Sequence, residues 1–298
     1  MGKTRLFITG ANGFIGKNLI SVLNRMPEYM VVAGVGNTWE KTASDREGGT
    51  GYVKCDISDD QFVPFISAKV EKCDVIIHLA AYISMEQDDR LIAVNVNGTS
   101  NIAKLANEWK VRKVIYISSI PVIGVPVVHP IDETHPLFPQ TLYHATKLSG
   151  EFILQACCDK QTDVISLRIP SPIGCGMNKK NFLSLLLEKC RNNEEIILFG
   201  HGGRKQNYID VRDVCRAILE VVVRDAKGVF CIGGTCISNE ELAKTCIALS
   251  DSKSPIIFKG MDKEEDNIWD ISFDKASGYL GYEPGYSLED TIRWLLGQ

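Results

Sequence analysis

The feature that most restricts the fold of this chain is a group of three glycines near its start. Gly10, Gly13 and Gly16 are spaced three apart, and they separate the apolar run Leu6–Ile8 from a segment with apolar residues at helical spacing. This order predicts a buried strand, a tight glycine turn and a helix. Glycine at these positions permits a sharp turn and close packing of the helix on the strand. The helix N-terminus would then offer N–H groups and a positive dipole end to a phosphate group.

Strand-like and helix-like segments alternate along the rest of the chain. Continuous apolar runs are typical of strands that are buried on both faces of a parallel sheet. We predict strands at 6–9, 30–35, 75–79, 114–118, 164–169, 196–199 and 229–232, and helices at 14–26, 89–109, 143–158, 180–192, 211–224, 238–250 and 287–296. The alternation predicts an α/β protein with a Rossmann-type, doubly wound parallel sheet.

The alternation becomes less regular after residue 169, where prolines and glycines follow one another closely. We therefore predict a nucleotide-binding domain of residues 1–169, joined by residues 207–233. Residues 170–206 and 234–298 would form a smaller C-terminal substrate-binding region. Ligands of such folds bind at the carboxyl ends of the parallel strands.

Composition restricts the class of protein and its partners. The 298 residues are 45% hydrophobic and 23% charged, which is ordinary for a soluble globular protein. The net charge of -4, without a basic block, argues against nucleic acid and anionic membranes as partners. No apolar stretch reaches the roughly 18 residues of a membrane span, and no signal peptide is visible. The ten cysteines are scattered without C-x-x-C spacing, so we expect reduced thiols in a cytoplasmic protein and no metal site.

A tyrosine and a lysine lie four residues apart, at Tyr143 and Lys147. In a helix, this spacing puts both side chains on one face, one turn apart. A neighbouring ammonium group, and a positively charged nicotinamide bound beside it, would stabilise the phenolate and lower the tyrosine pKa from its usual ~10. The tyrosine would then serve as a general acid or base near neutral pH. The same spacing also suits a core tyrosine beside a solvated lysine, so spacing alone does not decide.

A second candidate group is Ser119, which follows the apolar run Val114–Ser118. It would lie at the carboxyl end of a strand, where its hydroxyl can hold a reacting oxygen against Tyr143. A solvated serine at a strand end is the alternative interpretation.

The order of these motifs resembles that of one enzyme family. The glycine turn is followed by His78–Ala81, Asn95–Thr99, Ser118–Ser119 and the pair Tyr143 and Lys147. The extended short-chain dehydrogenases/reductases show this order. More narrowly, the sequence is similar to the NAD-dependent epimerases and dehydratases that act on nucleotide sugars. The similarity extends over nearly the whole chain, and the joint order of the motifs is far more specific than any one of them.

The resemblance implies a role for each matching residue. Tyr143 would be the acid/base, Lys147 would tune it and bind the nicotinamide ribose, and Ser119 would align the substrate oxygen. Hydride would move between the nicotinamide and a carbinol or keto carbon of the sugar. The residues implied to contact NAD or NADP are Gly10, Asn12, Gly13, Phe14, Ile15, Gly16, Asn37, Asp56, Ile57, Leu79, Ala80, Ala81, Asn95, Tyr143, Lys147 and Pro170.

The choice between NAD and NADP stays open. Relatives that prefer NAD carry an acidic residue near Val35, and those that prefer NADP carry an arginine near Gly36, but this sequence has neither. The polar and basic residues that could contact this end of the cofactor are Asn37, Thr38, Lys41 and Arg46.

The candidate substrate residues depart from the family pattern. Ser171 stands where sugar epimerases usually carry an asparagine, and Gln206 stands where many relatives have a diphosphate-binding arginine. Arg204 and Lys205, two and one residues away, could replace that arginine, although a solvated basic loop is an equal alternative. The predicted substrate-binding set is Ser119, Ser171, Asn178, Arg204 and Gln206, and Asn181 could add a polar contact.

These features favour an NAD(P)-dependent enzyme that acts on a nucleotide-diphosphate sugar, either as a 4-ketoreductase or as a 4-epimerase. Ile120–Pro121 replaces the Asp–Glu pair of most 4,6-dehydratases of this family, which disfavours dehydration. A reductase of a small aldehyde or ketone is the alternative. A non-catalytic cofactor-sensing module is disfavoured because Tyr143 and Lys147 are both present. Relatives commonly pair through the helices that contain Asn95 and Tyr143, so we expect a homodimer.

Overall fold

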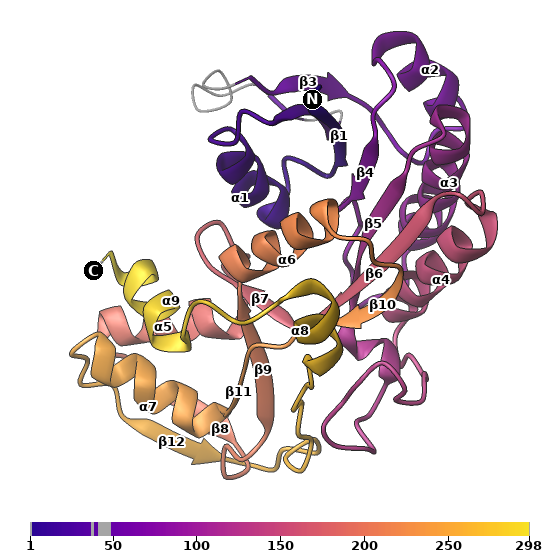
Figure 1. Cartoon of the computed structure of the whole chain (residues 1–298). Helices are drawn as coiled ribbons and strands as arrows, with labels where there is room; N and C mark the ends of the chain where they lie inside the picture. Colours follow the sequence, from indigo (N-terminus) through magenta and orange to yellow (C-terminus); the bar gives the residue numbers. More distant parts are fainter. Residues whose placement is uncertain (1, 37–38, 41–48, 298) are drawn as a thin grey trace. The chain divides into compact units, whose positions relative to one another are not determined.

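The structure is a computed structural model, and it describes residues 2–36, 39–40 and 49–297. The chain forms two compact units, each assembled from separate segments (Figure 1). The first unit comprises Met1–Gly124, Leu137–Arg168 and Cys215–Phe230, and the second comprises Val125–Pro136, Ile169–Val214 and Cys231–Gln298. Within the described residues, no helix is both long and apolar enough to cross a membrane.

A seven-stranded sheet in the order β10-β6-β5-β4-β1-β2-β3 forms the centre of the first unit. Its strands are β1 (Thr4–Thr9), β2 (Tyr29–Val35), β3 (Gly51–Lys54), β4 (Val75–His78), β5 (Lys113–Ser119), β6 (Asp163–Ile169) and β10 (Gly228–Cys231). The pairs β1–β2, β1–β4, β2–β3 and β4–β5 are parallel. The run 3-2-1-4-5-6 within this order is that of a doubly wound Rossmann sheet, so the predicted fold class is confirmed.

Helices cover this sheet, with α2, α3 and α4 on one side and α1 on the other (Figure 1). The helices are α1 (Phe14–Leu23), α2 (Phe62–Lys69), the π-helix η2 (Leu91–Asn97), α3 (Gly98–Trp109), the short η3 (Ile120–Ile123), α4 (Leu142–Cys157) and α6 (Val211–Val223). The predicted helix at 89–109 therefore begins with a wide π-helical segment. The sequence patterns did not predict α2 or β3, because both are short and α2 carries Pro64 near its start.

The strands are continuously apolar because side chains on both of their faces are buried. Phe7, Ile76 and Val114 come from three adjacent strands, and they share one core cluster with Ile102 and Trp109 of α3. The rings of Phe7 and Trp109 meet edge to face, with centroids 5.5 Å apart. Burial on both faces removes the alternation of apolar and polar residues that marks a half-exposed strand.

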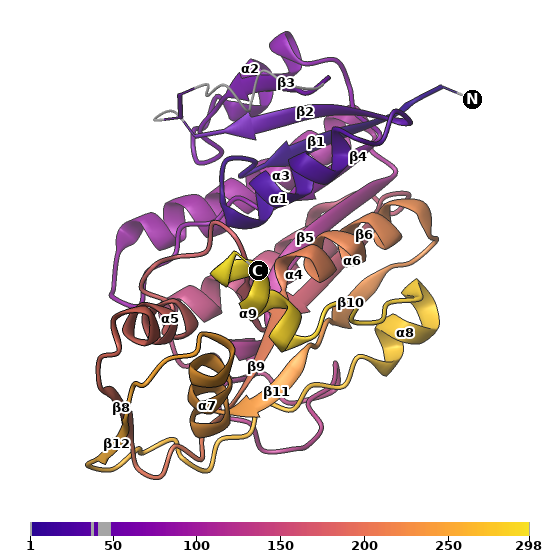
Figure 2. The same ribbon diagram turned by 90° about the vertical axis from the view of Figure 1, so that its left-hand side faces the viewer.

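The second unit contains two small sheets, one of β11, β9 and β7 and one of β12 and β8. Figure 2 shows β8 and β12 beside the helix α7. Its elements are β7 (Ser171–Ile173), α5 (Phe182–Asn192), β8 (Ile196–Phe199), β9 (Lys205–Asp210), β11 (Thr235–Ser238), α7 (Asn239–Leu249), β12 (Ile256–Lys259), α8 (Asp274–Leu280) and α9 (Leu288–Leu296). Strand β9 is parallel to β7 and antiparallel to β11. Strand β8 pairs with β12 in a separate sheet, so the segment 196–199 is a strand but not part of the Rossmann sheet.

The two units differ from the predicted domains where the chain passes between them. The prediction assigned 1–169 and 207–233 to the first domain, whereas Ile169 and residues 207–214 and 231–233 belong to the second unit. For residues 207–214 the reason is strand pairing, because Tyr208 and Asp210 pair with Ser171 and Ile173. The loop 125–136 also belongs to the second unit, where the N–H of Ile131 donates to the carbonyl of Asp270.

Candidate active site

The glycine turn joins β1 to α1 in a geometry that depends on the missing side chains. Gly10 has a φ of +66°, and a Cβ there would lie 2.6 Å from the backbone nitrogen of Ala80. A Cβ at Gly16 would lie 2.5 Å from the carbonyl oxygen of Gly10. A Cβ at Gly13 would meet only that same oxygen within 4 Å, at 3.1 Å. Gly10 and Gly16 are therefore required by the turn itself, whereas Gly13 keeps one side of the turn open.

The N-terminus of α1 begins at this open side. Its N-cap is Gly13, which provides no capping side chain, and the first turn of the helix has no acidic residue. Asn12, Phe14 and Ile15 are half-buried around it. An uncapped helix N-terminus beside an open glycine turn suits an anion, so these residues fit the phosphates of a dinucleotide.

The segment after β4 lies against the glycine turn. Thr9 accepts hydrogen bonds from the backbone N–H of Leu79 at its carbonyl (3.2 Å) and from that of Ala80 at its hydroxyl (3.3 Å). Leu79, Ala80 and Ala81 are all half-buried. The structure thus brings Leu79 and Ala80, two of the predicted cofactor residues, beside the predicted phosphate turn.

His78 is an internal histidine that ties together three strands and a helix. Its Nδ1 lies 2.7 Å from the Thr9 hydroxyl, its Nε2 lies 3.1 Å from the Thr99 hydroxyl, and its ring stacks on Tyr116. Burial lowers the pKa of His78 to about 3, so its ring is neutral at physiological pH. This histidine therefore supports the site without carrying charge.

Asn95 lies inside the π-helix and is almost fully buried. Its Oδ1 accepts from the N–H of Tyr82 (2.8 Å), and its Nδ2 donates to the carbonyl of Tyr82 (2.9 Å) and the hydroxyl of Thr146 (3.0 Å). The side chain is thus used within the chain, where it joins the segment after β4 to α4. This geometry favours a supporting role over the direct cofactor contact that was predicted.

The remaining predicted cofactor residues lie in different surroundings. Asp56 is exposed, and it accepts hydrogen bonds from the N–H and the hydroxyl of Ser58. The side chain of Ile57 is in the core, where a Cβ at Gly98 would clash with it, so a direct side-chain contact with a cofactor is not supported. Pro170 belongs to the second unit. Asn37, with Thr38, Lys41 and Arg46, lies outside the described residues.

The three predicted catalytic residues belong to the first unit. Ser119 is the last residue of β5, and Tyr143 and Lys147 lie one turn apart on α4. The helix begins at Leu142, immediately before Tyr143. Its N-cap is Thr141, whose hydroxyl accepts a hydrogen bond from the N–H of His144. Lys147 is only 4% exposed, and its Nζ lies 4.1 Å from the centroid of the Tyr116 ring.

The ionisation of the Tyr–Lys pair differs from the prediction. Burial raises the pKa of Tyr143 to about 12 and lowers the pKa of Lys147 to about 7. The predicted lowering of the tyrosine pKa is therefore wrong for the chain by itself. Lys147 is so strongly desolvated that it is only partly charged near neutral pH. The spacing of four predicted the shared helix face but not the burial of that face.

An ion pair that the sequence patterns did not predict lies one helical turn beyond Lys147. Glu151 on α4 and Arg168 on β6 are both buried, with a distance of 2.8 Å between Oε2 and Nη2. The only sequence signal was that Glu151 continues the spacing of four from Tyr143 through Lys147. No sequence pattern indicated that Arg168 pairs with Glu151, because the pairing depends on how β6 lies against the helix.

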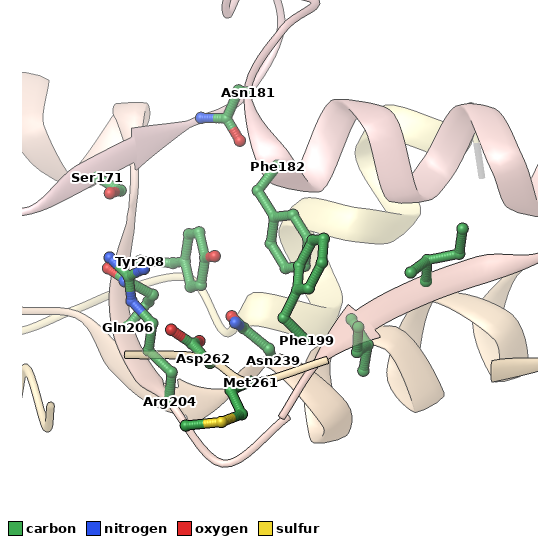
Figure 3. Close-up of a pocket in the computed structure, with 12 residues that line it drawn as sticks. Ser171, Asn181, Phe182, Phe199, Arg204, Gln206, Tyr208, Asn239, Met261 and Asp262 are labelled. Atoms are coloured by element: carbon green, nitrogen blue, oxygen red, sulfur yellow. The ribbon is translucent and has the colours of Figure 1, made fainter. Parts of the chain in front are cut away.

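The second unit contains a cavity of about 620 Å³, drawn in Figure 3. Three predicted substrate residues, Ser171, Arg204 and Gln206, line this cavity. Asn178 does not line it: this residue is exposed, and its Oδ1 accepts the N–H of Lys180. Asn181, the N-cap of α5, lines the cavity instead. Of the two asparagines predicted to contact the substrate, the structure therefore places only Asn181 at this cavity.

Arg204 and Gln206 contact one another at this cavity (Figure 3). With its amide oxygen turned toward Arg204, Gln206 accepts from Nε at 2.7 Å and from Nη2 at 3.0 Å. Nη1 of Arg204 lies 2.5 Å from a carboxylate oxygen of Glu264. A guanidinium group that is held from two sides has a fixed orientation, which suits it to bind an anion.

Comparison with known proteins agrees with the order of motifs and with the fold. The model of the NAD dependent epimerase/dehydratase family matches residues 6–233. The human dTDP-D-glucose 4,6-dehydratase is 25% identical to this chain, over 97% of the chain and 89% of the relative. A putative UDP-glucose 4-epimerase of Methanocaldococcus jannaschii is 27% identical, over 97% and 96%.

A solved structure shows the same fold over almost the whole chain. The UDP-glucose 4-epimerase of Thermotoga maritima, crystallised with UDP-glucose, has a TM-score of 0.86 at 23% identity, and the match covers 99% of this chain and 98% of that one. Because the family model covers most of the sequence, the chain belongs to the NAD-dependent epimerase/dehydratase family and is an enzyme of the extended short-chain dehydrogenase/reductase type.

Proposed function

We propose that this chain transfers hydride at a carbinol or keto carbon of a nucleotide-diphosphate sugar, as a 4-ketoreductase or a 4-epimerase. One observation carries this proposal: a single unit combines a glycine turn open to an anion with Ser119, Tyr143 and Lys147. The names of the relatives support a nucleotide sugar as the substrate class. Ile120–Pro121 in place of an Asp–Glu pair still argues against dehydration.

The residues of the first unit fit a nicotinamide dinucleotide, either NAD or NADP. The open side of the glycine turn and the uncapped start of α1 would bind the pyrophosphate. Lys147 would bind the nicotinamide ribose. The bound nicotinamide would supply or accept the hydride, whereas the chain positions and polarises the substrate.

Tyr143 would exchange a proton with the sugar oxygen, and the Ser119 hydroxyl would hold that oxygen in place. With the pKa of Tyr143 at about 12, the phenol is protonated at neutral pH and is ready to act as an acid. To act as a base, it needs a positive charge nearby that lowers its pKa, and a charged Lys147 would supply one.

We also propose that Arg204 binds the diphosphate, in place of the arginine that Gln206 replaces. Arg204 lines the cavity of the second unit, and Gln206 orients its guanidinium group. A diphosphate would replace the half-exposed carboxylate of Glu264 as the anionic partner. Ser171 and Asn181 would add polar contacts to this ligand.

The central test is turnover of a nucleotide 4-keto sugar. Purified chain is incubated with NADH or NADPH, the absorbance of the reduced cofactor is followed, and sugars are identified by NMR. A reductase oxidises the cofactor, whereas an epimerase interconverts the sugars without net oxidation. Tyr143→Phe is expected to reduce turnover roughly 100-fold or more while leaving cofactor affinity nearly unchanged. Undiminished turnover in this variant would refute the acid/base assignment.

Nucleotide affinity tests the substrate class separately. Calorimetry with UDP and dTDP is expected to show binding that Arg204→Met weakens at least tenfold, as for loss of one charge-assisted contact. Lys205→Met is the matched control, because the neighbouring lysine does not line the cavity. Absence of nucleotide binding in the unmodified chain would favour a small aldehyde or ketone as the substrate.

We further propose a cytoplasmic homodimer that forms through the helices η2, α3 and α4. Phe152 on α4 and Ile92 on η2 are apolar side chains that are 62% and 43% exposed. All ten cysteine side chains are thiols, which suits a reducing compartment. Sedimentation velocity is expected to show a dimer that Phe152→Glu dissociates and that Val223→Glu, on the exposed face of α6, leaves intact. A monomeric unmodified chain would exclude this assembly.

A further inference from the structure

A single face of α4 contains three chemically different groups at equal spacing. Tyr143, Lys147 and Glu151 follow one another at intervals of four residues, so they share this face. Lys147 and Glu151 are buried, at 4% and 5% exposure. A buried lysine and a buried glutamate one turn apart are close enough to form an ion pair with each other.

The carboxylate of Glu151 is instead directed at the neighbouring strands. Its Oε1 accepts hydrogen bonds from the hydroxyl of Ser118 at 2.5 Å and from Nε of Arg168 at 3.0 Å. Its Oε2 accepts from Nη2 of Arg168 at 2.8 Å. Arg168 thus holds the carboxylate by two parallel bonds, which fixes its orientation and balances its charge.

Lys147 has different neighbours. Its Nζ lies over the ring of Tyr116 on β5, 4.1 Å from the centroid. In the described part of the chain, no carboxylate lies within ion-pair distance of this amine. The titratable groups around it are Glu151 and Tyr143 on its own helix, Tyr116 on β5 and His78 on β4.

The charges explain why this arrangement matters for Lys147. An uncompensated Glu151 would attract the ammonium group, raise its pKa and bind it within the protein. Arg168, paired to Glu151, opposes this attraction, and burial is the larger effect on the pKa of Lys147. The pKa of Lys147 is accordingly lowered to about 7 although Glu151 acts in the opposite direction.

We propose that Arg168 and Glu151 act as positioning residues. Arg168 holds the Glu151 carboxylate away from Lys147, so that the amine of Lys147 stays available to ligands. The catalytic role of Lys147 in this statement rests on the proposed function, but the effect of the pair on the amine does not. Arg168 is thus assigned a function through Glu151, without contact to substrate or cofactor.

The test is a titration of Lys147 in the whole chain without substrate or cofactor. Lysines are labelled with ¹³C at Cε, and Lys147→Gln assigns the signal. The unmodified chain is expected to titrate near pH 7. In Arg168→Met, the midpoint is expected to rise by about one to three pH units, because Glu151 then faces the amine without its partner. In Glu151→Gln, the midpoint should stay at or below that of the unmodified chain.

Further variants keep the test decisive if Arg168→Met does not fold. Arg168→Lys retains a charge but cannot form the two parallel bonds, so its midpoint should also rise. The double variant Glu151→Gln/Arg168→Met removes both charges of the pair, so its midpoint should stay close to that of the unmodified chain. Glu220→Gln, which removes an exposed ion pair with Arg224, is the control and should leave the midpoint unchanged.

The outcomes separate this inference from the proposed function. Equal midpoints in the unmodified chain and in both Arg168 variants would overturn the inference and leave the pair with a purely structural role. Shifted midpoints in a chain that does not convert nucleotide sugars would support the inference and refute the substrate assignment instead.

Discussion

Lys147 is a residue whose burial makes the stability of the chain depend on pH. Folding transfers its amine from water into a site where burial lowers its pKa from 10.5 to about 7. Between these two values, the unfolded chain binds more protons than the folded chain, so the free energy of unfolding rises with pH across this window. Below pH 7 the amine is charged in both states, and the folded chain bears the full cost of the buried charge.

Lys147→Met is therefore expected to stabilise the chain at pH 6.5. The gain should be on the order of 1–3 kcal/mol, after loss of a contact with Tyr116 that contributes roughly 1–2 kcal/mol. The gain should shrink as the pH approaches 10, where the unmodified lysine is neutral when folded. Thermal unfolding at several pH values measures this difference. Lys104→Met on α3, an exposed position, should show no such pH dependence, and the same behaviour at Lys147 would contradict the assignment.

At the scale of residues, the sequence predicted identities better than environments. Ser119, Tyr143 and Lys147 could be singled out because their order and spacing are local properties of the chain. The burial of Lys147 and the ion pair between Glu151 and Arg168 depend on how α4 packs on β5 and β6. Such packing joins residues that no short sequence pattern links.

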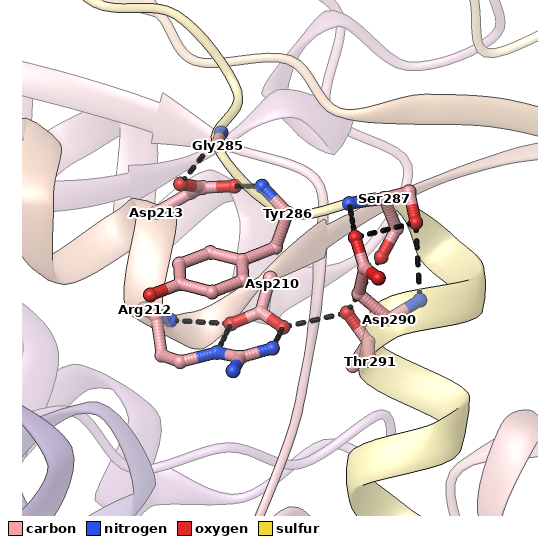
Figure 4. Close-up of polar contacts among 8 residues, drawn as sticks. All are labelled: Asp210, Arg212, Asp213, Gly285, Tyr286, Ser287, Asp290 and Thr291. Carbon is pink, nitrogen blue, oxygen red and sulfur yellow. Dashed lines mark hydrogen bonds and ion pairs between the residues drawn. The ribbon is translucent and has the colours of Figure 1, made fainter.

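At the scale of elements, a charged cluster anchors the C-terminal helix α9 within the second unit (Figure 4). Arg212, in the first turn of α6, donates from Nε and Nη2 to the carboxylate of Asp210, at 2.9 and 2.7 Å. Its guanidinium group lies 3.6 Å from the ring centroid of Tyr286 and 4.3 Å from that of Trp294. The hydroxyl of Thr291 donates to the same carboxylate. One arginine thus joins β9, α6 and α9.

Arg212→Met is expected to loosen α9. The carboxylate of Asp210 is fully buried, and the loss of its cation should lower the free energy of unfolding by about 3–5 kcal/mol. Hydrogen exchange in residues 288–296 should become faster. Arg224→Met, which removes an exposed ion pair with Glu220, is the control and should cost less than about 1 kcal/mol. Equal effects of the two variants would refute the anchoring role.

Elements were predictable where burial leaves a continuous apolar run. The predicted strands at 75–79 and 114–118 match β4 and β5 closely, because both are buried on two faces. Strand β9 was missed because it begins Lys205-Gln206-Asn207, which has no apolar run, and it is held by pairing with β7 and β11. Tertiary hydrogen bonding, rather than local preference, makes this segment a strand.

At the scale of the whole molecule, the first unit depends on a segment that comes late in the chain. Lys113 at the start of β5 is 1% exposed, and its amine donates to the carbonyls of Val221 and Arg224. A guanidinium nitrogen of Arg112 donates to the carbonyl of Val222. These carbonyls lie at the C-terminal end of α6, where a cation interacts favourably with the helix dipole.

A fragment of residues 1–168 is therefore expected not to fold by itself. It lacks β10 and the end of α6, so the ammonium of Lys113 would be buried without partners and the edge of β6 would be unpaired. Circular dichroism and thermal unfolding should show no cooperative transition, and addition of a peptide of residues 211–231 should restore one. A cooperative transition in the fragment alone would contradict this dependence. The apolar runs predicted the order of the strands but not this dependence on a late segment.

The π-helical turn of Leu91–Asn97 makes chain length itself a requirement of the site. A π-helix accommodates one residue more than an α-helix of the same rise, so removal of a single residue would return the segment to regular winding. Each residue of an α-helix corresponds to a rotation of about 100°, which would turn the Asn95 amide away from both Tyr82 and Thr146. Point substitutions along the outer face of this turn are tolerable, but insertions and deletions would disconnect the segment after β4 from the helix that carries the tyrosine and lysine.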